Sequence, residues 1–230
     1  MEATAIVTGG TGGLGSAVVQ RLLSEEWRVV VPWVVPEELE RLPPREGLEP
    51  VEANLFEQQS AAQVVSTATS PGSAPLGALV NLVGGFAAGG RVHETPIEEF
   101  ERQFQLNLRP TYLVTQAAIP PLLEQGGGSI VCVSSRAAVA PFPGAAGYVA
   151  SKAAVIAFTQ AVSKEYLDSG VRCNAILPSV IDTPANRTAM PEADHDRWVK
   201  PAEIASVIAH LVSPASAPIS GAAIPVYGRA

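Results

Sequence analysis

The stretch Thr8-Gly9-Gly10-Thr11-Gly12-Gly13-Leu14-Gly15 decides the fold, because it joins a short apolar run to a longer amphipathic one. The run before it, Thr4–Thr8, is typical of a buried strand, and Gly13–Glu25 carries leucine and valine at helical spacing. Glycines let the backbone approach a pyrophosphate, and a helix N-terminus offers free N–H groups and a positive dipole end. The stretch therefore predicts a dinucleotide-binding turn, although a tight turn without ligand has the same local pattern.

Short β-rich runs alternate with longer helical patterns along the rest of the chain. Helical patterns occupy Pro96–Gln125, Tyr148–Leu167 and Pro201–Leu211, the last with proline in its first turn. This order predicts an α/β fold with a doubly wound parallel sheet of seven strands and helices on both faces. The expected strands are Thr4–Thr8, Arg28–Val31, Glu49–Glu52, Ala78–Leu82, Ser129–Ser134, Val171–Leu177 and Ala222–Val226.

The alternating pattern has no internal repeat and no linker, so residues 1–230 are expected to form a single domain. Two stretches are expected to be loops, Ser70–Pro75 and Pro184–Lys200. The second is long and polar and follows a late strand. Residues 184–200 are therefore the expected substrate loop.

The composition of the chain excludes several classes of binding partner. The chain has 15 Lys and Arg against 22 Asp and Glu, a net charge of −7 without a basic run, which argues against nucleic acid and anionic membranes. The uncharged segment Gln58–Gly90 contains prolines and glycines that exclude a membrane span. The N-terminus lacks the features of a signal peptide, so a cytoplasmic protein with a small-molecule partner is expected. Cys132 and Cys173 are expected to be buried free thiols, and the scattered histidines predict no metal site.

Tyr148 and Lys152 are four residues apart in a helical pattern, so both side chains project from one face. An ammonium held near a phenol lowers the pKa of the phenol toward the working range, which suits a general acid for carbonyl reduction. A Tyr-x-x-x-Lys pattern also occurs in ordinary helices, so its meaning depends on the residues found with it.

The glycine-rich turn and the Tyr/Lys pair together resemble the short-chain dehydrogenase/reductase family, and the resemblance covers essentially the whole chain. The turn fits the family pattern Thr-Gly-x-x-x-Gly-x-Gly, and Tyr148-x-x-x-Lys152 fits the active-site signature. Ser135 stands where the family places the serine that orients the substrate oxygen. Asn107 matches the helix asparagine that supports a water leading to the lysine.

The resemblance implies a single-domain Rossmann fold and hydride transfer between NAD or NADP and a small carbonyl, alcohol or imine-like substrate. Tyr148 would be the acid/base, Ser135 would bind the substrate oxygen, and Lys152 would lower the tyrosine pKa and hold the nicotinamide ribose. Relatives pair two long helices, which implies a homodimer or homotetramer. The implied cofactor site consists of Gly9, Thr11, Gly13, Leu14, Gly15, Trp33, Asn54, Leu55, Asn81, Val83, Gly84, Tyr148, Lys152, Pro178, Ile181 and Thr183.

The chain departs from the family pattern where the adenosine ribose is expected. Trp33 stands at the position of the aspartate that NAD-using members carry, and Gly12 stands where many NADP users have arginine or serine. Trp33 either contacts the adenosine or packs under the sheet edge. Asn54-Leu55 replaces an Asp-Val pair beside the adenine. The choice between NAD and NADP stays open.

A narrower resemblance concerns the run Asp182–Asp194, which is similar to the substrate loop of dihydropteridine reductases. Those enzymes lack the catalytic serine and use the ribose-binding aspartate that is missing here. Arg187 is a fixed cation on this loop and is a candidate for substrate contact. Two alternatives to the general reductase are therefore kept: an activity like that of dihydropteridine reductase, and a dinucleotide-sensing protein without turnover.

Overall fold

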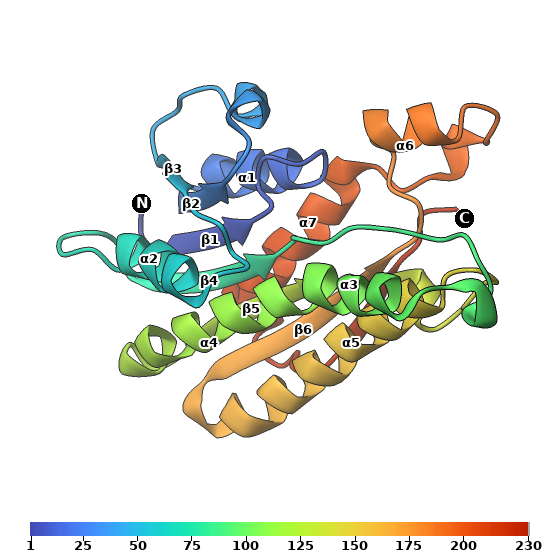
Figure 1. Cartoon of the computed structure of the whole chain (residues 1–230). Coiled ribbons are helices and arrows are strands. Elements are labelled where there is room, and N and C mark those ends of the chain that lie inside the picture. The colour runs from blue at the N-terminus through green and yellow to red at the C-terminus, as the bar shows by residue number, and fades with distance from the viewer. Residues whose placement is uncertain (230) are drawn as a thin grey trace.

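The computed structural model describes residues 1–229, which fold around one sheet of seven strands (Figure 1). The strand order is β3-β2-β1-β4-β5-β6-β7, and every neighbouring pair is parallel. The predicted doubly wound α/β fold is thereby confirmed, with strand ends shifted by one or two residues. The strands are β1 (Thr4–Thr8), β2 (Arg28–Trp33), β3 (Leu48–Glu52), β4 (Leu76–Asn81), β5 (Gly128–Val133), β6 (Val171–Pro178) and β7 (Ala223–Val226).

Helices cover both faces of the sheet, and the strands carry apolar side chains on both faces because both are buried. Along β1, Ile6 packs into one core cluster while Ala5 and Val7 pack into the other, because alternate side chains point to opposite faces. One cluster lies under α1 (Gly15–Ser24) and α7 (Pro201–Val212). The other lies under α2 (Gln58–Ala68), α4 (Arg109–Glu124) and α5 (Ala146–Tyr166).

The helix predicted over Pro96–Gln125 is two helices, α3 (Ile97–Asn107) and α4, which meet at Leu108. Pro110 lies in the first turn of α4 and has no N–H to continue the hydrogen bonds of α3. The prediction of one continuous helix was therefore wrong. The break places Asn107 at the end of α3, next to the sheet.

Two further helical segments differ from the sequence prediction. No helix was predicted for α2, although its buried residues have helical spacing: Ala61, Val64, Val65 and Ala68. The expected loop Pro184–Lys200 begins with α6 (Pro184–Ala189) and contains η5 (His195–Arg197). Thr183 caps α6, since its Oγ1 accepts a hydrogen bond from the Asn186 N–H at 3.3 Å.

Cys132 and Cys173 are free and buried, as predicted. No helix among residues 1–229 is both long enough and apolar enough to cross a membrane. Within the same residues, no three His, Cys, Asp or Glu side chains gather into a potential metal site.

The chain passes from β1 to β2 on one side and returns to β4 on the other side of β1. In open α/β sheets, such a reversal of strand order opens a crevice at the carboxyl ends of the strands. The segments that follow β1, β4, β5 and β6 all begin at this edge, so it brings the predicted site residues together.

Candidate active site

The glycine-rich turn is held so close to its neighbours that side chains would not fit. Gly9 has a φ of 65°, and a Cβ on it would lie 3.2 Å from backbone atoms of Leu82 and Val83. A Cβ on Gly15 would collide with the Gly9 carbonyl oxygen. Gly13 is exposed, so the backbone at the start of α1 is open to a ligand. This cradle fits a pyrophosphate.

The loop that follows β6, here called the β6 loop, contacts the glycine-rich turn. A Cβ on Gly13 would lie 3.0 Å from the methyl group of Thr183. Ile181 forms an isolated parallel bridge with Val199, which holds the start of the loop against the segment before α7. Thr183 and Ile181 thus lie at the carboxyl edge, whereas Pro178 is buried at the end of β6.

Asn107 ties the loop after β4 to the first turns of α5. Its Oδ1 accepts a hydrogen bond from the Gly85 N–H at 2.9 Å, and its Nδ2 donates to Ser151 Oγ at 3.0 Å. Ser151 Oγ in turn donates to the Tyr148 carbonyl oxygen at 2.8 Å. Asn107 is 1% exposed, so this network has little competition from water. It fixes the backbone that carries Tyr148.

Lys152 lies next to this network at the end of β5. Its Nζ donates to the Val133 carbonyl oxygen at 3.1 Å, and a Cβ on Gly84 would lie 3.0 Å from Nζ. Burial lowers the pKa of Lys152 from 10.5 to about 8, and Cys132 acts weakly in the other direction. An ammonium has three N–H donors, so two remain available for a ligand beside Gly84.

Tyr148 is half-buried, with Phe86 packed edge-on at 5.0 Å between ring centroids. Burial raises the pKa of Tyr148, and a hydrogen bond with Ser135 acts in the opposite direction. The expected lowering of this pKa by Lys152 is wrong for the chain by itself, because desolvation dominates and Nζ binds the Val133 carbonyl. The phenol is therefore protonated at neutral pH.

Ser135 begins the 3₁₀ turn η3 (Arg136–Ala138), and its Oγ accepts from the Ala137 N–H at 3.1 Å. That bond uses a lone pair of Oγ, so the hydroxyl proton stays available for the hydrogen bond with Tyr148 or for a substrate oxygen beside it. The next residue, Arg136, lies over the Tyr227 ring at 5.2 Å from the centroid.

Two aromatic rings near Tyr148 were not predicted as site residues. Phe142 lies 6.3 Å from Phe86 between ring centroids, and both side chains are exposed. Exposed aromatic residues on two separate loops at one place are a signal that only the fold reveals.

Two side chains that the resemblance implied as cofactor contacts are closed to a ligand. Asn81 is 2% exposed and its Nδ2 donates to Thr115 Oγ1 on α4 at 3.1 Å. Leu55 is 6% exposed and belongs to the core under α2 and α4. Their side chains support the site from below, and the assignment of both residues to the cofactor site stays a prediction. Val83 also packs partly against that core.

The end of β2 differs most from the family pattern. Trp33 is half-buried at the last position of β2, in register with Glu52 on β3. Asn54 is exposed and forms a local turn, because its Oδ1 accepts from the Phe56 N–H at 3.2 Å and its Nδ2 donates to Glu57 at 3.0 Å. Both residues lie near the carboxyl edge.

Arg187 does not present a free cation. Its guanidinium forms two hydrogen bonds with the Asp182 carboxylate, at 2.5 and 2.9 Å. This contact holds the pKa of Asp182 below its ordinary value. The expected substrate contact by Arg187 would require this ion pair to open.

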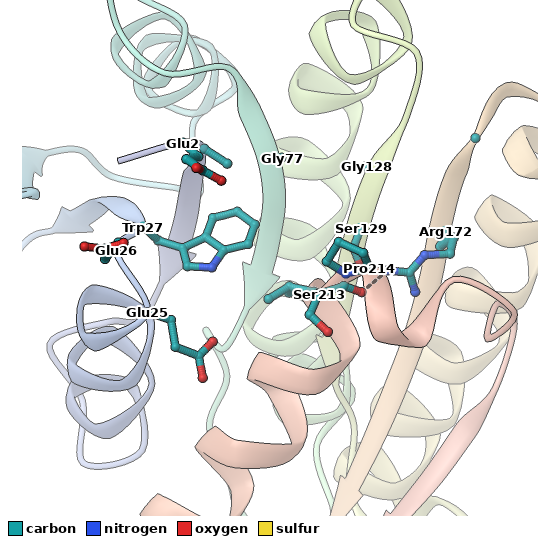
Figure 2. Close-up of a pocket in the computed structure, with 13 residues that line it drawn as sticks. Glu2, Glu25, Glu26, Trp27, Gly77, Gly128, Ser129, Arg172, Ser213 and Pro214 are labelled. Carbon is teal, nitrogen blue, oxygen red and sulfur yellow. Dashed lines mark hydrogen bonds between the residues drawn. The ribbon is translucent and has the colours of Figure 1, made fainter.

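Two of the cavities lie at opposite edges of the sheet. The larger, about 490 Å³, is at the amino edge, with Trp27 and glutamates on one side and Arg172 on the other (Figure 2). The smaller, about 230 Å³, lies beside Tyr148 and is lined by the loop 87–90 and by Phe100 and Gln103 of α3. The smaller cavity is the one that adjoins the candidate chemistry.

Comparisons with known proteins agree with this geometry. Residues 3–194 match the family model described as short chain dehydrogenase. The chain is 32% identical over 202 residues to 2-(R)-hydroxypropyl-CoM dehydrogenase of Xanthobacter autotrophicus, which covers 84% of this chain and 80% of the relative.

Two solved structures share the whole fold. The 3-ketoacyl-(acyl-carrier-protein) reductase from Brucella melitensis, complexed with NADH, has a TM-score of 0.87 and 28% identity, covering 99% of this chain and 98% of the other. A single-residue variant of actinorhodin polyketide ketoreductase with NADPH has a TM-score of 0.89 and 28% identity, covering 99% and 96%.

Proposed function

The chain belongs to the short-chain dehydrogenase family, and from this premise we propose that it interconverts a ketone and a secondary alcohol beside Tyr148. It is an NAD(P)-dependent oxidoreductase, and the bound nicotinamide supplies or accepts the hydride. The observation that carries the site assignment is the network at the carboxyl edge, in which Asn107 connects the loop after β4 to the helix of Tyr148 and Lys152.

Tyr148 is the proposed proton donor in the reductive direction. Its raised pKa keeps the phenol protonated at neutral pH, so it can protonate the substrate oxygen as negative charge develops there. Ser135 Oγ accepts from the Ala137 N–H and keeps its own proton, which it would donate to the same oxygen when substrate is bound. Phe86 covers one side of the phenol and limits the access of water.

Lys152 is proposed to hold the nicotinamide ribose with the two donors that Val133 leaves free. With a pKa of about 8, most of its population is charged at neutral pH. A ribose hydroxyl beside Lys152 would also connect the ammonium to the phenol, which the chain alone does not do. Asn107 is then a positioning residue for both side chains.

The proposed cofactor site uses the open backbone of the glycine-rich turn for the pyrophosphate, from Gly9 and Thr11 to Leu14. Thr183 and Ile181 are proposed to hold the carboxamide, since their loop contacts the turn at Gly13. The buried residues Asn81, Leu55 and Pro178 shape the site without direct contact through their side chains.

The proposed substrate class is a ketone attached to a larger group. The similar proteins named above are a hydroxypropyl-CoM dehydrogenase, a ketoacyl-carrier reductase and a polyketide ketoreductase, and each name includes an alcohol or a ketone on such a group. The cavity beside Tyr148 leaves room for the part of the substrate next to the reacting carbon. The similarity of Asp182–Asp194 to dihydropteridine reductases stays a prediction.

The test is a binding titration followed by a substrate screen. NADH and NADPH are titrated first, and turnover is then followed by nicotinamide absorbance with β-keto thioesters, simple ketones and a quinonoid dihydropteridine. We expect turnover with a ketone. Turnover with the dihydropteridine alone would favour the narrower resemblance. Dinucleotide binding without turnover of any substrate would contradict the proposal and favour a sensing protein.

We also propose that the chain is a homodimer or homotetramer. Tyr112 on α4 is 47% exposed and packs against Phe158 on α5, at 5.8 Å between ring centroids. Phe158 is half-buried, so the pair presents the exposed Tyr112 ring on a firm base, which is suited to burial against a second copy. Light scattering at micromolar concentration should give a multiple of the chain mass, and a monomer would contradict this proposal.

A further inference from the structure

Two charged residues that follow β2, Glu38 and Arg41, contact Thr11 in the glycine-rich turn. The family pattern assigns no role to either of these two residues. Thr11 Oγ1 donates to Glu38 Oε2 at 2.7 Å, and Arg41 Nη1 donates to the Thr11 carbonyl oxygen at 2.9 Å. Arg41 and Glu38 also form an ion pair at 3.2 Å. We call these three residues the Glu38 clasp. It joins η1 (Pro36–Arg41) to the turn after β1.

The clasp lies where the sheet geometry places the adenosine ribose. Thr11 is in the turn at the end of β1, and Trp33 ends the neighbouring strand β2, with η1 following it. In doubly wound nucleotide-binding sheets, the ribose next to the pyrophosphate lies between these two strand ends. Trp33 offers no charge there. Glu38 and Arg41 are the charged side chains that the structure ties to the turn.

The two members of the ion pair favour different dinucleotides. A carboxylate accepts hydrogen bonds from ribose hydroxyls and repels a phosphate on the 2′ oxygen. A guanidinium attracts that phosphate and binds it through two N–H groups. Both side chains are partly exposed, with 50% for Arg41 and 37% for Glu38, so each has bonding capacity left for a ligand.

We propose that the Glu38–Arg41 pair sets the choice between NADH and NADPH, with Glu38 favouring the 2′-hydroxyl and Arg41 favouring the 2′-phosphate. The inference rests on the proposed cofactor site. Because the two charges oppose one another, the unaltered protein should discriminate weakly. Removing either charge should expose the preference of the other.

Glu38→Gln and Arg41→Gln test the proposal, each measured as the ratio of the NADH and NADPH dissociation constants. Losing one charge-assisted contact should change this ratio about tenfold, toward NADPH for Glu38→Gln and toward NADH for Arg41→Gln. The affinity for NADPH should also fall with added salt less steeply in Arg41→Gln than in the unaltered protein.

The chain offers matched controls within a few residues. Glu40 and Arg45 are exposed, and in the described part of the chain neither side chain makes a hydrogen bond or an ion pair within the protein. Glu40→Gln and Arg45→Gln make the same changes in net charge and should leave the ratio within about twofold, because exposed charges at a distance are screened. Thermal unfolding of all four variants identifies any loss of folding.

Opposite shifts in the two clasp variants, absent in the controls, support the proposal. A folded Glu38→Gln or Arg41→Gln variant with an unchanged ratio overturns it, and so does an equal shift in the matching control. The proposed function fails separately, if the unaltered protein binds neither dinucleotide. Should a variant fail to fold, Glu38→Asp and Arg41→Lys are measured, with smaller shifts in the same directions expected.

Discussion

The two halves of the candidate site are built differently. Around β5 and α5, Asn107 and Lys152 are nearly inaccessible and their polar atoms are bound to the protein. Around β2 and η1, the polar contacts are the partly exposed Glu38–Arg41 pair, its two hydrogen bonds to Thr11 and a local turn at Asn54. Buried networks hold geometry to a fraction of an ångström, whereas exposed pairs contribute little and rearrange easily. The rigid half suits proton transfer, and the exposed half suits the choice of cofactor.

The largest effect should come from the rigid half. Tyr148→Phe removes only the proton-transfer group, so turnover should fall by about 10²- to 10⁴-fold while dinucleotide affinity stays within a few fold. Steady-state kinetics and a binding titration measure the two quantities. Tyr166→Phe, at the end of the same helix, is the control and should change neither. Near-normal turnover in Tyr148→Phe would remove Tyr148 from the proposed chemistry.

The buried ammonium of Lys152 should lower the free energy of unfolding at neutral pH, because burial disfavours its charged form. The folded protein loses the Lys152 proton near pH 8, while the unfolded chain keeps it to about pH 10.4, so burial of the ammonium destabilises the fold by about 3 kcal/mol below pH 8. This penalty disappears as pH rises from 8 to about 10.4, because the unfolded state then binds more protons than the folded state.

Lys152→Met should therefore be more stable than the unaltered protein at pH 7 and inactive. After subtraction of about 1 kcal/mol for the lost bond to Val133, a gain of about 2 kcal/mol in the free energy of unfolding is expected. Urea unfolding at pH 7 and pH 10 measures it. The gain should vanish by pH 10, and a gain independent of pH would show that Lys152 is not held with a lowered pKa.

The same contrast explains which features could be predicted from sequence. The strands follow from local patterns of β-branched residues. The Tyr148/Lys152 pair follows from its four-residue spacing read together with the glycine-rich turn, Asn107 and Ser135. The break at Leu108 had a local signal in Pro110, which the continuous apolar pattern concealed. The Glu38 clasp had none, because the contact between Glu38 and Thr11 depends on how η1 folds back over the sheet. Spacing along the chain does not encode such a contact.

The burial of Asn81 and Leu55 shows a second reason why parts of the site could not be predicted from sequence. A motif identifies positions near a ligand, but it does not say which side chain points to the ligand and which points into the core. At the end of β4, Asn81 faces α4, and only the backbone beyond it reaches the edge. Alternation along the strand decides this, and it depends on where the strand ends.

In the exposed half, Trp33→Asp should move the dinucleotide preference about tenfold toward NADH. The new carboxylate would accept bonds from ribose hydroxyls and repel a 2′-phosphate. The unaltered protein should distinguish NADH from NADPH by less than about tenfold, since no single charge dominates there. Calorimetric titration with both dinucleotides measures the shift.

Tryptophan fluorescence sharpens this prediction. Trp33→Phe should abolish most of the fluorescence response to dinucleotide, whereas Trp27→Phe should keep it, because Trp27 lies at the amino edge of the sheet (Figure 2). An unchanged preference in Trp33→Asp would place Trp33 away from the ribose. A response that survives in Trp33→Phe and is lost in Trp198→Phe would come from the segment that pairs with Ile181.

The smallest effect should come from Arg187, because its guanidinium is already bound by Asp182. Arg187→Gln should raise KM for substrate by less than about threefold, since an exposed ion pair contributes little.

The clearer effect of Arg187→Gln should be on the pH dependence of stability. Arg187 holds the pKa of Asp182 below its ordinary value, so the stabilisation from this carboxylate is lost only as pH falls through that lowered pKa. Without Arg187, the pKa of Asp182 moves back toward its ordinary value, so most of this stabilisation is absent at neutral pH and the acid limb becomes shallower. Thermal unfolding across the acid range measures the change. A tenfold rise in KM with no shift in that acid limb would mean that Arg187 leaves Asp182 to bind the substrate, and the β6 loop would then belong with the rigid, chemical half of the site.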